Sequence, residues 1–315
     1  MNKLQKAIHV LLHERGKIGL LLLPKMGGIL PDKTYVKLYY RFSIGKKLNL
    51  KNPQTFTEKL QWLKLYDHNP LYTTLVDKYA VKPWVAERIG EQYIIPTLGV
   101  WDSFDEIEFD KLPDQFVLKT THGGGSIGVV ICKDKTTFDK AEAKKKLERS
   151  MQISGYEKHR EWPYKHVPRR ILAEQYLEPD PVLNDLPDYK FFCFNGEPRY
   201  CQVVSGRNTK KSIDFFDKEW NHQPFREPKK YPNADIEPQR PKYLDTMWQL
   251  AAQLAENKPF VRIDFYELAD GVRFGEITFF PTSGLGVFEP VEYDIVLGQM
   301  IKLPIDSPSV ANNSK

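Results

Sequence analysis

The stretch "DQFVLKTTHGGGSIGVVIC", residues 114–132, places three consecutive glycines between two segments that look like β-strands. The first segment ends in Lys119, and the second is apolar and β-branched. A P-loop needs a helix after its glycines, so this stretch is not a Walker loop. Glycine has no Cβ and tolerates positive φ, which lets backbone N–H groups lie against phosphate oxygens. The stretch predicts either a phosphate-binding hairpin, with Lys119 supplying charge, or a flexible hairpin tip.

The composition is that of an ordinary soluble globular protein. Of 315 residues, 41% are hydrophobic and 28% are charged, which is typical of such chains. The three cysteines, at 132, 193 and 201, show no CxxC spacing, so neither a zinc site nor a disulfide-stapled fold is indicated. The apolar run at residues 18–24 is far shorter than the roughly 20 residues that span a bilayer. A reducing, cytoplasmic setting is expected.

Positive charge is concentrated at the start of the chain. Residues 1–50 hold ten Lys and Arg against two acidic residues, a net charge of +8, whereas the whole chain carries +5. This asymmetry predicts an anionic partner, such as an acidic polymer or the inner face of a membrane, or else a solvated helical surface. Nucleic acid is not an expected partner.

Local signals divide the chain into a helical N-terminal region and a mixed domain. Thr55 and Glu58 form a capping box that begins a helix, and a boundary is expected near residues 67–72. From residue 75 onward helical and strand patterns alternate, and Asn195-Gly196 predicts a tight hairpin. The expected domains are a basic helical region at 1–72, an α+β domain at 73–303 with a lid near 113–177, and a mobile tail at 304–315.

Two late segments each carry an acidic residue. Strand alternation puts Arg262 and Asp264 on one face of "FVRIDFY". In "VRFGEITFF" the same alternation puts Phe274, Glu276 and Thr278 on one face. If the two segments pair as a hairpin, their acidic residues become neighbours in only one of the two main registers.

The length of the turn decides whether these carboxylates meet. A three-residue loop, Ala269-Asp270-Gly271, would pair Asp264 with Glu276, whereas a two-residue Asp-Gly turn would send them to opposite faces. Paired carboxylates repel unless a cation lies between them, and hard oxygen ligands with open positions suit Mg²⁺ that also binds phosphate. The pattern predicts a Mg²⁺ site, or else a surface network in which Arg262 and Arg273 neutralise the acids.

A third feature is the segment "ILAEQYLEPD", which reads as a strand that stops at Pro179. An extended segment that ends at proline leaves backbone groups that could hold a flat base, with nearby acids facing a sugar hydroxyl. An ordinary edge strand has the same signature.

Taken in order, these features resemble an ATP-grasp enzyme over about residues 75–290, beginning with Asp77-Lys78 at the start of a helix. More narrowly, "NPQTFTEKLQWLKLYD", "DKYAVKPWV", "FVLKTTHGGGSIGV", "DYKFFCFNG" and "FGEITFFPTSG" resemble the TupA-like ATP-grasp family, which is associated with bacterial surface polysaccharide biosynthesis. The resemblance implies an α+β ATP-grasp fold, in which two α+β subdomains grip ATP under the glycine hairpin, with a helical N-terminal extension.

The resemblance also implies roles for single residues. Lysines and glycines would contact the triphosphate, the backbones of Gln175 and Leu177 would hold adenine, and Asp180 would face the ribose. Lys190 is either a further phosphate contact or a surface lysine. The expected ATP-binding residues are Lys78, Lys119, Gly123, Gly124, Gly125, Ser126, Glu174, Gln175, Leu177, Asp180 and Lys190, and the expected Mg²⁺ ligands are Asp264, Glu276 and Thr278.

Three positions carry open questions. Thr278 stands where the wider superfamily commonly has asparagine, and a hydroxyl is a weaker metal ligand. Arg262 and Arg207 are catalytic candidates that would stabilise transferred phosphate or bind a carboxylate substrate, and each could instead form a structural ion pair.

The implied reaction begins when the γ-phosphate of ATP activates a carboxylate as an acyl phosphate. An amine then attacks to form an amide, with ADP and phosphate released. Positioning and charge neutralisation supply most of the catalysis in phosphoryl transfer. The family's setting suggests that an amine or amino acid is joined to a sugar carboxylate, such as a hexuronic acid of a capsule or cell-wall polymer. The alternatives are a glycosyltransferase of the same pathway, a kinase of the same fold and a catalytically silent polysaccharide-binding module.

Overall fold

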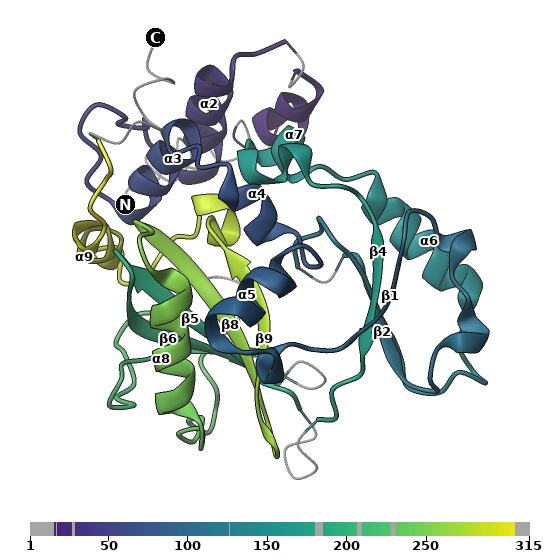
Figure 1. Ribbon diagram of the computed structural model, residues 1–315. Helices are drawn as coiled ribbons and strands as arrows, with labels where there is room; N and C mark the ends of the chain where they lie inside the picture. Colours follow the sequence, from purple (N-terminus) through teal and green to yellow (C-terminus); the bar gives the residue numbers. More distant parts are fainter. Residues whose placement is uncertain are drawn as a thin grey trace.

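The computed structural model describes residues 16, 18–26, 29–125, 127–179, 185–206, 210–227 and 231–305. Two separate antiparallel sheets, each with helices against it, make the chain an α+β protein (Figure 1). Residues 1–15 and 17 of the predicted basic N-terminal region lie outside the described residues, as do residues 306–315 of the predicted tail. The described helices are α2 (Asp32–Ile44), α3 (Phe56–Tyr66), α4 (Leu71–Val76), α5 (Val81–Ile89), α6 (Lys140–Met151), α7 (Gly155–His159), α8 (Leu244–Ala255) and α9 (Tyr293–Met300), with 3-10 segments η1 (Leu23–Met26), η2 (Glu91–Tyr93), η3 (Phe104–Glu106), η4 (Phe109–Lys111), η5 (Trp162–His166) and η6 (Pro281–Gly284).

The larger sheet has the strand order β7-β6-β5-β8-β9 and is antiparallel throughout. Its hairpin between β5 and β6 turns at Asn195 and Gly196, which have φ of 51° and 87°, so the predicted tight hairpin is confirmed. Helix α8 covers one face of the sheet through an apolar stripe that includes Met247, Leu250 and Leu254 (Figure 1). The strands are β5 (Asp188–Phe194), β6 (Glu197–Ser205), β7 (Ser212–Phe216), β8 (Phe260–Leu268) and β9 (Gly271–Thr278).

The smaller sheet has the order β1-β4-β2-β3 and packs against α6 on its outer side (Figure 1). Strands β2 (Phe116–Thr120) and β3 (Val129–Cys132) pair antiparallel, which confirms the hairpin predicted at 114–132. Strand β1 (Thr97–Trp101) also belongs to this sheet, because it pairs with β4 (Ile171–Gln175). The sheet therefore begins earlier than the range of 113–177 expected for the lid.

Helix α3 begins at the predicted capping box, where Thr55 and Glu58 cap each other reciprocally. Its side chains bind residues near the other end of the chain: Thr57 Oγ1 donates to Asp294 at 2.8 Å, and Lys59 Nζ donates to the carbonyl of Ile301 at 2.7 Å. The expected boundary at residues 67–72 follows this helix, so the helix lies on the N-terminal side of the boundary but packs on the C-terminal part of the fold.

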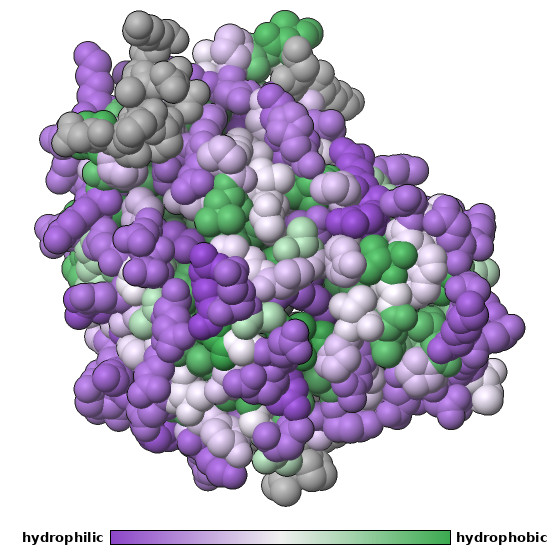
Figure 2. Space-filling model, viewed as in Figure 1, coloured by the Kyte–Doolittle hydropathy of each residue, from purple (hydrophilic) through white to green (hydrophobic). Residues whose placement is uncertain are grey.

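Hydrophilic side chains cover most of the face shown in Figure 2, and hydrophobic ones form small groups. Near the start of the described chain, Ile18, Leu21 and Ile29 are 55%, 73% and 82% exposed. Among the residues described, no helix has both the length and the apolar character needed to cross a membrane.

Candidate active site

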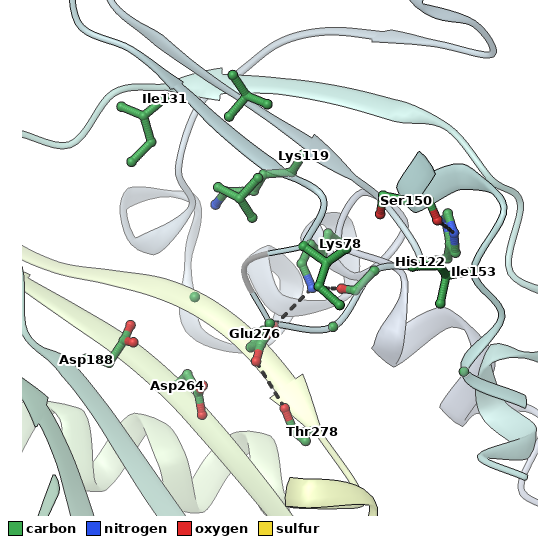
Figure 3. A pocket seen from close by; sticks show the side chains of 18 of the residues that line it. Lys78, Lys119, His122, Ile131, Ser150, Ile153, Asp188, Asp264, Glu276 and Thr278 are labelled. Atoms are coloured by element: carbon green, nitrogen blue, oxygen red, sulfur yellow. Dashed lines mark hydrogen bonds and ion pairs between the residues drawn. The ribbon is translucent and has the colours of Figure 1, made fainter. Parts of the chain in front are cut away.

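A cleft of about 1370 Å³ lies between the two sheets and is lined by residues from both. One wall carries Lys78 and Lys119, and the other carries Asp264, Glu276 and Thr278 (Figure 3). Strand β2 and the turn between α4 and α5 supply the two lysines, whereas β8 and β9 supply the acids. The glycine hairpin and the late acidic pair, far apart in sequence, thus face one cavity.

Asp264 pairs directly with Glu276 across β8 and β9. Leu268 pairs with Gly271, so the loop is Ala269-Asp270, which is neither the three-residue loop nor the two-residue Asp-Gly turn expected from the sequence. A bulge next to Asp264 inserts one extra residue in β9 and shifts the register by one. The bulge therefore restores the pairing that a two-residue turn alone would have destroyed.

The bulge also corrects the predicted face of Phe274. Phe274 pairs with Phe265 and lies in the hydrophobic core, on the opposite face from Glu276 and Thr278. Gly275, between Phe274 and Glu276, lets the strands approach, because a Cβ there would lie 3.0 Å from the carbonyl oxygen of Asp264. Strict alternation through β9 was wrong because it assumed an unbroken ladder.

Replacing Gly275 with valine should therefore disturb the acidic pair. The added methyl groups would press on the Asp264 carbonyl and on the Tyr266 ring, and overpacking of this kind costs about 1–3 kcal/mol. We expect a lower free energy of unfolding in urea. The matched control is Gly124→Ala, where an added Cβ meets nothing within 4 Å; equal stability of the two variants would contradict the close approach.

Arg262 holds the acidic residues together. Its Nη2 donates to Asp264 Oδ2 at 2.8 Å, to Glu276 Oε1 at 3.0 Å and to Thr278 Oγ1 at 3.1 Å. Lys190 Nζ adds a close ion pair with Asp264 and lies 3.4 Å from Asp188 Oδ2. The predicted catalytic arginine, phosphate lysine and metal ligands thus converge, and here the cations neutralise the acids.

Lys78 links the two walls of the cleft. Its Nζ donates to the carbonyl oxygen of Gly123 at 2.7 Å and to Glu276 Oε2 at 3.0 Å (Figure 3). Asp77 fixes the backbone beside it, since Asp77 Oδ1 accepts from the amides of Tyr79 and Ala80 at 2.8 and 3.1 Å. The ammonium group is therefore held at the junction of the glycine hairpin and the acidic pair.

The electrostatic environment keeps Glu276 ionised. Burial alone would raise the pKa of Glu276, but Lys78, Arg262 and Lys190 outweigh it and hold the pKa well below its ordinary value. Burial alone would lower the pKa of Arg262, but the carboxylates of Asp264 and Glu276 outweigh burial and raise this pKa overall. Opposite charges thus stay fully developed in this part of the cleft at neutral pH.

Lys119 forms an ion pair with Glu174. Glu174 also binds Lys82, which the sequence analysis did not identify. Glu174 is 4% exposed, and its two oxygens lie 2.6 Å from Lys119 Nζ and 2.5 Å from Lys82 Nζ. Burial raises the pKa of Glu174, yet the two lysines bring it below its ordinary value. Lys82 sits on α5 with no local motif to mark it, so only its contacts with Thr97 on β1 and Glu174 on β4 identify it.

The glycines of the hairpin serve different geometric needs. A Cβ on Gly123 would come within 2.4 Å of Thr120 Oγ1, whereas Gly124 has open space around it and Gly125 has a φ of 64°. Gly128, not singled out before, is as crowded as Gly123, because a Cβ there would lie 2.2 Å from Thr120 Oγ1. Tight packing fixes the base of the loop, and the open glycines line the cleft.

The predicted adenine residues stand apart from this cluster. The amide of Gln175 donates to the carbonyl of Pro96 at 3.0 Å, so this N–H is already used. Neither Gln175 nor Leu177 is among the described residues that line the cleft. Their roles, like that of Glu174 in nucleotide binding, stay proposals. Ser126, Asp180 and Arg207 lie outside the described residues.

Other cleft residues escaped the sequence analysis. Asp188 is 2% exposed and precedes Lys190 by two residues, so strand alternation in "DYKF" could have placed both on one face. His122 is 5% exposed, its Nε2 lies 3.2 Å from the carbonyl oxygen of Ser150, and burial lowers its pKa. Glu161 gave no local signal, because its environment comes from segments more than a hundred residues away.

The donor set of the acidic pair fits a hard divalent cation. The side chains of Asp264, Glu276 and Thr278 offer only oxygen donors. The carboxylates of Asp264 and Glu276 are neighbours across the two strands. Within the described ranges, no group of three or more His, Cys, Asp or Glu could hold a metal by itself. Mg²⁺ commonly takes one or two carboxylates and completes its shell with water and substrate phosphates. These residues match that mode of binding.

Comparisons with known proteins place the chain in one family. A family model described as "TupA-like ATPgrasp" matches residues 58–302, which include most of α3 and all the residues that line the cleft. No curated protein matches the chain.

Several solved structures share a distant likeness of fold. The D-alanine–D-alanine ligase of Helicobacter pylori matches with a TM-score of 0.41 and 14% identity over 79% of this chain and 70% of that one. That of Bacillus anthracis, complexed with ATP, gives 0.40 and 16% over 76% and 66%. A carboxyaminoimidazole ribonucleotide synthase of Aspergillus clavatus, complexed with ATP, gives 0.37 and 13% over 65% and 45%.

Proposed function

Because the chain belongs to the TupA-like ATP-grasp family, its fold is the α+β ATP-grasp fold and it is an ATP-grasp enzyme of the ligase type, and from this premise we propose the finer activity. The proposed reaction joins a carboxylate to an amine, with ATP hydrolysed to ADP and phosphate through an acyl phosphate. The supporting observation is the contact of Lys78 with both Gly123 and Glu276. This contact brings the proposed phosphate loop and the proposed metal ligands to one point.

In this proposal the cations exchange partners when ATP enters. Lys78, Lys190 and Arg262 now bind the carboxylates of Asp264 and Glu276. Phosphate oxygens would compete for the same donors, and charge-assisted hydrogen bonds to phosphate are strong. Lys119, 18% exposed at its side chain, would contact the phosphates from the other wall. Arg262 would then stabilise the charge of the transferred phosphoryl group or orient the acid substrate.

Asp264 and Glu276, with Thr278, would hold Mg²⁺. When bound, the ion would neutralise negative charge on the phosphates. The residues themselves supply two adjacent carboxylates fixed by the bulge at Gly275. The open glycines Gly124 and Gly125 would cover the triphosphate and exclude water, which would otherwise hydrolyse the acyl phosphate.

The proposed substrates rest on the family's association with surface polysaccharides. We propose that the acid is a sugar carboxylate such as a hexuronic acid, and that the second substrate is an amino acid or other amine. The basic N-terminal region, with a net charge of +8 over residues 1–50 and exposed Ile18, Leu21 and Ile29, would meet an acidic polymer or the inner face of the cytoplasmic membrane.

Hydroxylamine trapping tests the proposal directly. The protein is incubated with ATP, Mg²⁺, hydroxylamine and one of a panel of uronic acids and amino acids, and both ADP and hydroxamate are measured. We expect both products with the right acid only. If neither ADP release nor hydroxamate formation depends on the added acid for any member of the panel, the ligase activity is contradicted. Stabilisation by ATP but not by nucleotide sugars in a thermal unfolding assay separates the ligase from the glycosyltransferase alternative.

A further inference from the structure

The turn that follows β9 forms a second polar region in the cleft. Thr282 and Ser283 have φ of 50° and 57°, and Gly284 has a φ of 66°, so two successive non-glycine residues adopt the left-handed conformation. Such residues cost of order 1–3 kcal/mol each and persist only where their surroundings hold them. Both Thr282 and Ser283 line the cleft.

Helix α3 holds this turn from behind. Gln61 Nε2 donates to the carbonyl oxygens of Ser283 and Gly284 at 3.1 and 2.8 Å, and Lys64 Nζ donates to that of Ser283 at 2.8 Å. Gln61 and Lys64 are each 2% exposed, so both donors are committed. The backbone carbonyls point to α3 and are used there, which leaves the hydroxyl side chains for other partners.

Each hydroxyl is tied to a carboxylate. Ser283 Oγ donates to Glu161 Oε1 at 2.6 Å, and Thr282 Oγ1 donates to Glu227 Oε1 at 3.4 Å. Glu161 is 9% exposed and lines the cleft. The hydrogen bond from Ser283 uses Oε1, and Oε2 lies outside that contact. This end of the cleft is therefore acidic, in contrast to the lysine-rich end that would take phosphate.

The acidic end lies beside the reacting end. Tyr164, also in the cleft wall, is affected by both: burial raises its pKa well above the usual value, and the charges of Glu161, Glu276 and Asp264 raise it further while Arg262 lowers it. Glu161 lines the same cleft as Asp264 and Glu276, but it lies outside the cluster of acids and cations that would bind ATP.

A buried carboxylate that opens onto a cleft needs a cationic partner. The charge of Lys64 partly offsets the rise that burial causes in the pKa of Glu161, but Lys64 Nζ is hydrogen-bonded to Gln61 and Ser283 and forms no ion pair with Glu161 within 4.0 Å. An amine substrate arrives at neutral pH as an ammonium ion, which can form that close ion pair.

We propose that Glu161, positioned by Ser283, binds the amine substrate as its ammonium ion; this inference rests on the proposed ligase function. Glu161 then takes one proton from the ammonium group, and the neutral nitrogen attacks the carbonyl carbon of the acyl phosphate. The C–N bond forms, the C–O bond to phosphate breaks, and the second proton leaves with the phosphate. The substrate class is a primary amine that is protonated in solution.

Two small nucleophiles that differ in charge test this assignment. Methylamine is protonated at neutral pH and hydroxylamine is mostly uncharged, yet the two are nearly equal in size. For Glu161→Gln we expect the KM for methylamine to rise roughly 10- to 100-fold, the loss typical of a charged hydrogen bond. The KM for hydroxylamine and the affinity for ATP should be unchanged. Glu157→Gln, at an exposed position on α7, is the matched control.

Glu161→Gln removes a negative charge near Lys64, so a second variant must control for the positive charge that is left. In Lys64→Gln/Glu161→Gln both charges are removed while residue 64 keeps a hydrogen-bond donor for the carbonyl of Ser283, and the defect with methylamine should remain. Recovery of methylamine use in this double variant, or an equal effect of Glu161→Gln on both nucleophiles, would overturn the proposal. So would a wild-type protein that uses hydroxylamine but not methylamine. Absence of hydroxamate from the wild-type protein with every acid would instead refute the ligase activity itself.

Discussion

Glu276→Gln is expected to lower Mg²⁺-dependent ADP release by about 100- to 1000-fold, the range typical when one preorganised electrostatic contact is removed from a reaction centre. The variant keeps the size of the side chain but removes the charge that Lys78 and Arg262 now share. The proposed metal site would lose one of its two carboxylates. The measurement is a coupled assay of ADP release at saturating ATP over a range of Mg²⁺ concentrations.

Asp270→Asn is the matched control for this experiment. Asp270 belongs to the turn of the same β8–β9 hairpin and pairs with Arg273, but its side chain is 68% exposed. Removing its charge should leave ADP release unchanged, because exposed ion pairs contribute little. Full Mg²⁺-dependent turnover by Glu276→Gln would show that the acidic pair is a structural ion network, the alternative that the sequence left open.

Glu174→Gln is expected to reduce the free energy of unfolding by about 3–5 kcal/mol, the usual cost of breaking a buried ion pair by removing one partner. Glu174 is 4% exposed and binds Lys82 and Lys119 together. Its loss leaves two partly or fully buried ammonium groups without their shared counter-ion. Equilibrium unfolding in urea, followed by circular dichroism, measures the change.

An exposed ion pair of the same chemistry provides the comparison. Glu108 lies 2.7 Å from Lys111, with side chains 59% and 74% exposed, and Glu108→Gln should change stability little. A loss of stability in Glu174→Gln as small as that in Glu108→Gln would mean that water reaches the buried pair, and that Lys119 is free to bind phosphate without giving up a structural contact.

The features predicted correctly from sequence depend on residues that are close in the chain. The glycine hairpin at 114–132, the Asn195-Gly196 turn and the capping box at Thr55 and Glu58 each occupy a short window, so local conformational preference decides them. The family resemblance added the order of the lysines and acids, which no single window contains. The match over residues 58–302 confirms that resemblance.

The features missed depend on contacts between distant segments. The loop between Leu268 and Gly271 has two residues, and only the bulge at Gly275 pairs Asp264 with Glu276. An isolated glycine in a strand pattern does not show where a bulge will shift the register. Lys82 and Glu161 lie in segments with ordinary local composition. Their partners are Glu174 and Ser283, roughly a hundred positions away, so neither environment can be read without the packed structure.

The bonds from α3 to the C-terminal part of the fold make that helix part of the catalytic unit. Gln61 and Lys64 supply the donors for the left-handed turn at 282–284, and Thr57 and Lys59 anchor α9 and its end. A fragment that starts at residue 73 would lack all four anchors and would expose the apolar surface that α3 covers. Helix α3 is therefore not a detachable module, and domain exchange between relatives would have to carry α3 along with the sheet it serves.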